Sequence, residues 1–145
     1  MRFTTEKVAD VEDAILELAP RHNAAAGWAP RLNVAVGNYL ALERVGALRV
    51  YVAWTPEGAV AGYGVFVISP HMHYGVRVAT QDSLYVLPAW RPHALEFMAW
   101  QDRQLEAEGV EAIFRCSTRR HPYGPALERL GYSQDSVIYV RRPAL

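Results

Sequence analysis

Two histidines two residues apart, His71 and His73, are one group of side chains that could carry chemistry. In an extended segment, residues i and i+2 share one face, so the two imidazoles would lie together. Such a pair can act as a general base, a proton shuttle or a set of metal ligands. Metal binding is the least favoured use, because no cysteine or third histidine stands at a ligand spacing. Two solvated loop histidines are the alternative without function.

A strand-like run that leads directly into a helix start is the second candidate. Residues 82–91 read Asp-Ser-Leu-Tyr-Val-Leu-Pro-Ala-Trp-Arg, and Pro92 suits the first turn of a helix. The free N–H groups at a helix N-terminus attract phosphate, and ligands of α/β sheets bind beyond the carboxyl ends of strands. The junction therefore predicts an anion site, although every strand-helix unit offers the same dipole.

The single cysteine, Cys116, excludes an intrachain disulfide and fits a reducing compartment. It falls inside a predicted strand, residues 111–117, and this position predicts a buried structural thiol rather than a nucleophile. Arg119 and Arg120 follow that strand. They either bind an anion, such as a nucleotide phosphate or an acidic partner, or point into solvent.

The composition predicts one domain over residues 1–145. Apolar residues make up 51% of the chain and charged residues 21%, which suits a globular core. No apolar run reaches the roughly 20 residues of a membrane helix, and the N-terminus lacks a signal-peptide core, so we expect a cytoplasmic protein with no membrane partner. The net charge of zero argues against nonspecific nucleic-acid binding.

Hydrophobic periodicity predicts an α/β fold in which helices flank a mixed sheet. Asn33 suits an N-cap, and Gly46 and Gly109 suit the residue after a helix. Strand 60–68 is apolar at both parities, which predicts a central strand, and strand 76–87 is long enough to need a bend or bulge. The predicted helices span residues 8–19, 33–46, 92–109 and 123–130, with a loop over 21–31. The predicted strands span residues 48–54, 60–68, 76–87, 111–117 and 136–141.

The junction also carries a family pattern. Leu84-Tyr85-Val86-Leu87-Pro88-Ala89-Trp90-Arg91 resembles the core motif of the GNAT acyltransferases, Leu-x-Val-x-Pro-x-aromatic-Arg before a glycine-rich turn. Leu127-Glu128-Arg129-Leu130-Gly131-Tyr132 is similar to the last helix and closing turn of that family. Pro70-His71-Met72-His73-Tyr74 followed by Asp82 resembles a bacteriophage-associated branch. The resemblance covers nearly the whole chain and implies a GNAT-like fold with a central, mostly antiparallel, splayed sheet.

This resemblance implies acetyl-CoA as the cofactor and an amine-bearing molecule as the acceptor. In the family, pantetheine amides pair with the backbone of the core strand, and the pyrophosphate sits on N–H groups of the following turn. The cofactor-binding residues implied here are Leu84, Tyr85 and Val86 for the pantetheine and Arg91, His93 and Ala94 for the pyrophosphate.

The turn departs from the family pattern. It reads Arg91-Pro92-His93-Ala94-Leu95-Glu96 and has none of the glycines that let a backbone close around two phosphates. Pro92 removes one N–H donor. Glu96 would bring a negative charge toward the phosphates, unless the helix starts one turn earlier and directs this side chain to solvent.

The resemblance also implies catalytic residues. Acyl transfer to an amine needs a base for the amine proton and an acid for the leaving thiolate. Asp82 stands where many relatives carry an acidic residue at the acceptor site, which implies a base or substrate anchor, and His73 would lie nearby. Leu127 occupies the position of the family's tyrosine acid and cannot serve, so Tyr123, one turn earlier, is the predicted substitute.

Three functions follow as hypotheses. The first is an acyl-CoA-dependent N-acetyltransferase that acts on an amine acceptor. The second is a catalytically degenerate GNAT-fold binding protein, phage-encoded and directed at a host factor, whose partner is another protein or a second copy of the chain. The third is a GNAT-like enzyme that modifies nucleic acid, which the neutral charge disfavours.

Overall fold

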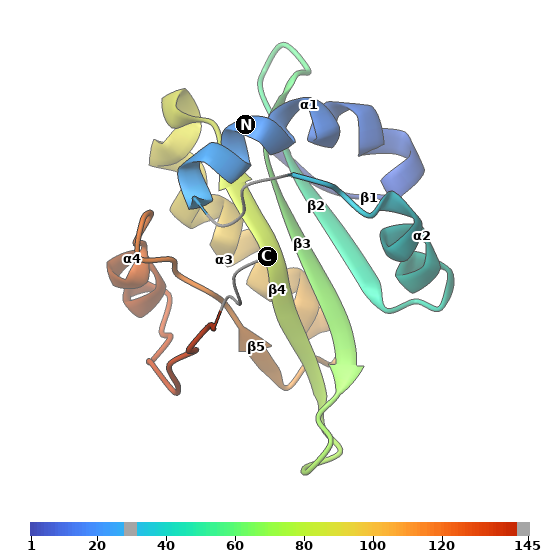
Figure 1. The fold of residues 1–145 in the computed structure, drawn as a ribbon, viewed down its shortest axis with the longest axis vertical. Coiled ribbons are helices and arrows are strands. Elements are labelled where there is room, and N and C mark those ends of the chain that lie inside the picture. The colour runs from blue at the N-terminus through green and yellow to red at the C-terminus, as the bar shows by residue number, and fades with distance from the viewer. Residues whose placement is uncertain (28–31, 142–145) are drawn as a thin grey trace.

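The computed structural model describes residues 1–27 and 32–141, and these form a central sheet with helices on both faces (Figure 1). The strands lie side by side in their sequence order. They are β1 (Arg2–Glu6), β2 (Leu48–Trp54), β3 (Val60–Pro70), β4 (Arg77–Val86) and β5 (Ala112–Phe114). The helices are α1 (Val8–Ala26), α2 (Val36–Arg44), the short 3₁₀ helix η1 (Pro88–His93), α3 (Ala94–Ala107) and α4 (Gly124–Arg129).

Strands β1 to β4 pair antiparallel, and β5 pairs parallel to β4. The mixed α/β sheet predicted from the sequence is therefore confirmed. The central position predicted for residues 60–68 is confirmed as well, because β3 pairs with β2 on one side and β4 on the other. Between β3 and β4 the register shifts, with Val65 opposite Ser83 and Phe66 opposite Gln81. The extra residue is Asp82, so the bulge predicted in this strand falls there.

Each face of the sheet carries its own hydrophobic core. Val52, Tyr63 and Tyr85 face α1 and α2, and they pack with Val11 and Leu18 of α1. The alternate residues of the same strands face α3 instead. They are Tyr51, Ala53, Phe66 and Val86, which pack with Phe97 and Leu105. This alternation is the period-2 pattern of a strand that is buried on both sides.

Helix α1 corrects the predicted helix end at residue 19. The helix continues through Pro20 to Ala26 and ends at Gly27, whose φ of 61° and N–H bond to the Asn23 carbonyl form a left-handed cap. The missing Pro20 donor costs one hydrogen bond, but His22 and Ala25 pack onto the sheet and hold the last turns. No helix in the described part of the chain is long and apolar enough to cross a membrane. The rest of the predicted loop, residues 28–31 including Trp28, lies outside the described residues.

Two further predicted boundaries need correction, and one strand was missed. Helix α2 begins at Val36 with Ala35 before it, not at an Asn33 cap. Strand β5 ends at Phe114 and not at residue 117. The strand β1 was not predicted. Its Phe3 packs 5.1 Å from Phe97 between ring centroids, which holds β1 against the α3 face.

The last predicted strand is wrong. Residues 136–141 form no strand and pair with no described strand, and a segment without a partner has no ladder of hydrogen bonds to define it as one.

Candidate active site

The fork between β4 and β5 is the central feature of the candidate site. The two strands pair only from Val78 to Thr80, opposite Ala112 to Phe114. Beyond that point β4 continues to Val86 and bonds to β3 on one side only. No described strand covers its other edge, so the backbone groups of residues 83–86 on that edge are free for a ligand. The splayed sheet expected from the sequence is thus present.

Asp82 lies at the mouth of this fork. The bulge turns its side chain outward on the α1/α2 side, where Tyr39 Oη donates a 2.7 Å hydrogen bond to Asp82 Oδ2. Asp82 is exposed, and Oδ1 accepts no hydrogen bond from the described residues. Burial, and then the nearby Asp82 carboxylate, raises the pKa of Tyr39, so this phenol stays a donor at neutral pH. The Tyr39–Asp82 pair therefore presents a carboxylate that is held at Oδ2 and leaves Oδ1 open to solvent.

An imidazole that the sequence did not single out packs on the α1 side of β3 and β4. His22 Nδ1 lies 2.7 Å from Tyr63 Oη, and its ring stacks on Tyr85 at 5.2 Å and 14°. Burial is the main cause that lowers the pKa of His22; Asp82 opposes the effect and His121 adds to it. His22 is therefore a neutral imidazole at physiological pH. The apolar stripe of α1 is the signal that could have indicated His22, because His22 follows Leu18 by four residues. Pro20 hid this signal, since it suggested that the helix ends there.

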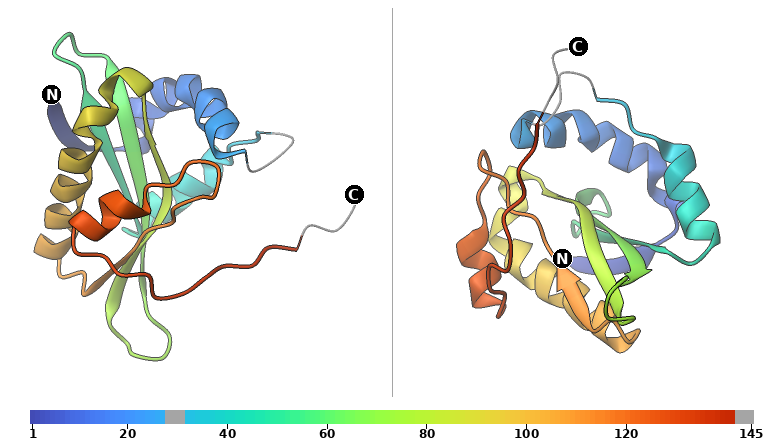
Figure 2. Two further views of the ribbon diagram at one scale, coloured as in Figure 1. Left: turned by 90° about the vertical axis from the view of Figure 1, so that its left-hand side faces the viewer. Right: turned by 60° about the horizontal axis from the view of Figure 1, so that its bottom comes forward.

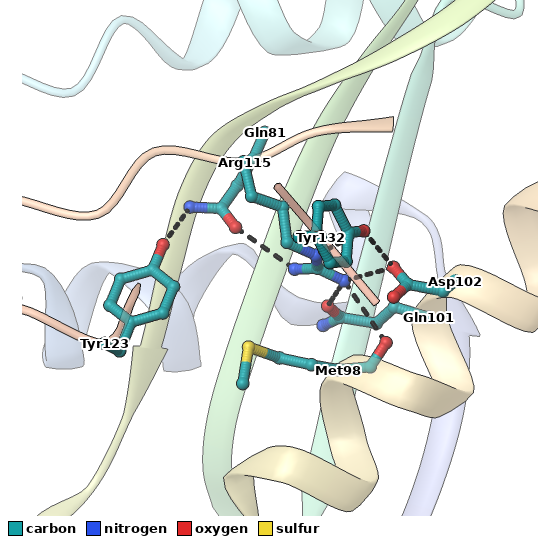
Figure 3. A network of polar contacts seen from close by, with 7 residues as sticks. All are labelled: Gln81, Met98, Gln101, Asp102, Arg115, Tyr123 and Tyr132. Carbon is teal, nitrogen blue, oxygen red and sulfur yellow. Dashed lines mark hydrogen bonds and ion pairs between the residues drawn. The ribbon is translucent and has the colours of Figure 1, made fainter. Parts of the chain in front are cut away.

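On the α3 side of the same fork, Gln81 reaches across to Tyr123 (Figure 3). Gln81 Nε2 donates to Tyr123 Oη at 2.8 Å, and Tyr123 Oη donates to the Cys116 carbonyl. Burial raises the pKa of Tyr123, so its hydroxyl keeps its proton at neutral pH. Because Gln81 and Asp82 are consecutive, the structure brings the predicted residues Asp82 and Tyr123 to the same fork, on opposite faces of β4.

Arg115 is the central donor of this network. Its fully buried guanidinium donates to Asp102 Oδ1 at 2.6 Å, to Gln81 Oε1 at 3.1 Å and to Gln101 Oε1 at 3.1 Å. Tyr132 Oη also donates to Asp102 Oδ1 at 2.9 Å. No local sequence pattern marks this cluster, since its members come from β4, α3, the residue after β5 and the chain beyond α4. The cluster links β4 and α3 to the residue that follows β5, next to the point where β4 and β5 stop pairing.

The junction after β4 differs from the predicted helix start. Helical structure begins at Pro88, one turn earlier than expected, as the 3₁₀ helix η1. The N–H of Ala94 donates to the Arg91 carbonyl, so it is not free for a phosphate. Arg91 and His93 are exposed at this turn. Glu96 is also exposed, as expected for an early helix start, and lies 3.9 Å from His93 Nδ1.

The remaining predicted residues separate into two groups. Leu84 and Val86 pack on the α3 side and Tyr85 on the α1 side, so only their backbone can line the free edge. His71 and His73 lie in the turn between β3 and β4, at the end of β4 away from Val86 (Figure 1). Residues 77–81 of β4 separate the turn that holds His73 from Asp82, so the structure does not bring these two predicted residues together.

Two predictions about the segment after β5 have different outcomes. Cys116 is exposed, which corrects the buried thiol expected from a longer strand. Arg119 and Arg120 are exposed too, but the Arg120 side chain lies against Gly27, where an added Cβ would be 2.8 Å from Arg120 Cζ. The loop after β5 therefore reaches the C-terminal end of α1.

Comparison with known proteins supports one conclusion about the fold. No protein-family model matches the chain, and no curated protein is similar to it in sequence. Solved structures do match over nearly the full length of both chains. A probable acetyltransferase superposes with a TM-score of 0.74 at 14% identity, covering 100% of this chain and 98% of that one.

Two further matches have described activities. Ribosomal-protein-alanine N-acetyltransferase from Brucella melitensis biovar Abortus 2308 superposes with a TM-score of 0.68 at 21% identity, covering 98% of this chain and 99% of that one. Glucosamine-6-phosphate N-acetyltransferase from Arabidopsis thaliana gives 0.74 at 12%, covering 99% and 100%. The chain therefore has the fold of the GNAT acetyltransferases.

Proposed function

We propose that the protein is an acyl-CoA-dependent N-acetyltransferase that acts on an amine acceptor. The observation that carries this proposal is the open fork between β4 and β5, with Asp82 on one face and Tyr123 on the other. A fork of this kind offers an unpaired strand edge next to an acid and a base. Acyl transfer to an amine requires both an acid and a base. The fold shared with known acetyltransferases adds support from an independent direction.

The residues fit acetyl-CoA better at the strand than at the turn. The free backbone edge of residues 83–86 can pair with the pantetheine amides as a further strand would. At the turn, the 3₁₀ geometry uses the Ala94 N–H, and Arg91 and His93 are left as side-chain partners for the phosphates. Arginine binds phosphate with two parallel hydrogen bonds, so Arg91 is the main expected contact.

The protein groups would divide the proton transfers between the two faces of β4. When bound, acetyl-CoA supplies the acetyl group as a thioester. Asp82 Oδ1 accepts a proton from the ammonium group of the acceptor, while Tyr39 holds Oδ2 in place. Tyr123 holds its proton at Oη and is the donor on the leaving-group side.

The decisive experiment measures acetyl-CoA binding by calorimetry and thiol release with a panel of amine acceptors. We expect binding in the wild type, and Asp82→Asn should keep that binding while turnover falls by about 10²–10⁴-fold. Glu57→Gln, an exposed carboxylate in the β2–β3 turn, is the matched control and should leave both unchanged. No heat and no thermal shift at millimolar acetyl-CoA would sink the proposal.

A binding protein without catalysis is the second candidate, and the junction favours it. The turn has no glycine, two of the six residues of η1 are proline, and the Ala94 donor is occupied. Leu127, at the position of the family's tyrosine acid, is buried in the structure. This function predicts a protein that is folded by circular dichroism and binds no acetyl-CoA. It also predicts that Asp82→Ala and Tyr123→Phe leave binding to its protein partner intact.

A further inference from the structure

The hydrogen bonds around Tyr123 fix the direction in which its proton points. The loop that leads from β5 to α4 carries both Cys116 and Tyr123 (Figure 2). Tyr123 Oη lies 2.8 Å from Gln81 Nε2 and also contacts the Cys116 carbonyl oxygen. An amide nitrogen only donates, and a carbonyl oxygen only accepts. The phenol oxygen therefore accepts from Gln81, and its single proton goes to an acceptor, which in this structure is the Cys116 carbonyl.

The orientation of the Gln81 amide follows from its contact with Arg115. Arg115 Nη1 lies 3.1 Å from Gln81 Oε1. A guanidinium group has donors only, so the amide atom that faces it has to be the oxygen. The amide nitrogen is thereby directed to Tyr123. Gln81 is only 7% exposed, so little water competes for either end of the amide.

Arg115 cannot turn away from this amide, because its other donors are occupied as well (Figure 3). Nη2 donates to Asp102 Oδ1 at 2.6 Å, to Gln101 Oε1 at 3.1 Å and to the Met98 carbonyl at 3.2 Å. Nε donates to Tyr132 Oη at 3.0 Å. A guanidinium is a rigid planar group, so fixing Nη2 and Nε also fixes the direction of Nη1.

We propose that Gln81 is the positioning residue of the proton donor Tyr123, and that Arg115 sets the orientation of Gln81. This inference rests on the proposed function, in which Tyr123 protonates the leaving group. In that step Tyr123 Oη gives its proton to the sulfur as the carbon–sulfur bond breaks, and it regains a proton from water afterwards. The Gln81 N–H stays on the phenol oxygen and stabilises the negative charge that forms there.

The same hydrogen bond bears on the acidity of the phenol. Burial raises the pKa of Tyr123; the bond from Gln81 and the nearby Arg115 charge oppose that rise, and Cys116 adds to it. A donor on the oxygen favours the charged form of the phenol. Gln81 Nε2 also lies 3.5 Å from the Cys116 carbonyl oxygen, so its second N–H can serve that carbonyl once the phenol proton has left.

The first test uses the protein without acetyl-CoA. Replacement of Tyr123 by 3-fluorotyrosine, a more acidic phenol, allows ¹⁹F NMR to follow the ionisation of this one residue. Gln81→Met removes the N–H donor without adding a charge, and Gln81→Glu removes it while keeping an acceptor for Arg115. Both should raise the pKa at position 123. Gln134→Met, the same change at an exposed glutamine, should leave it unchanged. A pKa that stays at the wild-type value in both Gln81 variants overturns the proposal.

The second test is a double-mutant cycle in acetyl transfer. Gln81→Met should lower kcat by about 10–10²-fold, which corresponds to one hydrogen bond to a charged group, and leave the KM for acetyl-CoA unchanged. Tyr123→Phe should lower kcat by about 10²–10⁴-fold. Adding Gln81→Met to Tyr123→Phe should then change kcat by less than about twofold, because Gln81 acts through the phenol.

The outcomes of the two tests separate this inference from the proposed function. If Gln81→Met lowers kcat equally with and without the Tyr123 hydroxyl, Gln81 acts only on the fold and the positioning role is refuted. A wild type that binds acetyl-CoA but transfers no acetyl group would refute the proposed function instead. The ¹⁹F titration would then still decide whether Gln81 directs the phenol, since it needs no turnover.

Discussion

The fully buried guanidinium of Arg115 lies 2.6 Å from Asp102 Oδ1, and this ion pair joins the residue after β5 to α3. Two charges in such a position stabilise the fold only while both are present, because either one alone is left buried without a counter-charge. The pair also holds Gln81, and through Gln81 it positions Tyr123 at the fork.

Asp102→Ala should therefore lower the free energy of unfolding by about 3–5 kcal/mol, since it leaves the Arg115 charge without its carboxylate. Urea unfolding followed by circular dichroism measures the change. Arg103→Ala alters the neighbouring exposed charge on α3 and should change stability by no more than about 0.5 kcal/mol. Equal effects of the two substitutions would contradict the role given to the buried pair.

Gly64→Ala tests the space that β3 leaves for Gln101. A Cβ at residue 64 would overlap Gln101 Nε2 and lie 3.1 Å from Gln101 Cδ, and Gln101 is fully buried. We expect a loss of about 1–3 kcal/mol, because the amide must move away from Arg115. Adding Gln101→Ala should remove much of that loss, so the double-mutant cycle should show coupling. Gly37→Ala, with nothing within 4 Å, is the control and should not destabilise the protein. Purely additive effects of Gly64→Ala and Gln101→Ala would argue against the contact.

Tyr39→Phe tests how Asp82 is positioned for the proposed reaction. The hydroxyl holds Asp82 Oδ2 at 2.7 Å, and a hydrogen bond to a charged group contributes about 1.5–3 kcal/mol. We expect kcat to fall by roughly tenfold, with little change in the KM for acetyl-CoA, because α2 lies away from the free strand edge. Steady-state kinetics of both substrates separates the two constants. A rise in the KM for acetyl-CoA at constant kcat would instead place Tyr39 in cofactor binding.

His22 predicts a pH dependence of stability. Burial lowers the pKa of His22 from the ordinary histidine value of about 6.5, so the unfolded chain binds a proton there more readily than the folded chain. Stability should therefore fall as the pH drops from about 6.5 toward the folded pKa. Urea unfolding at pH 7.5 and 5.5 measures the loss. His22→Gln, which keeps a polar group near Tyr63 Oη, should show a smaller loss than the wild type. If His22→Gln loses as much stability between pH 7.5 and 5.5 as the wild type does, groups other than His22 cause the loss.

Much of the fold can be predicted from the sequence alone. Alternating and 3.6-residue hydrophobic patterns predicted β2, β3, β4, α3 and α4 close to their observed positions, because buried faces leave these periods in the chain. The length of β4 predicted a bulge, and the motif from Leu84 to Arg91 indicated the fold that the solved structures share. Asp82 and Tyr123 were named as candidates and meet at one fork.

Tertiary structure decided what those patterns cannot contain. Pro20 suggested a helix end, but packing against Tyr85 carries α1 past it and places His22 on the sheet. The Arg115 network joins residues far apart in the chain, and no local period marks such contacts. His73 and Asp82 were separated by residues 77–81 of β4. The segment 136–141 carries a strand pattern without a strand, because pairing depends on a neighbour that the sequence of one segment does not specify.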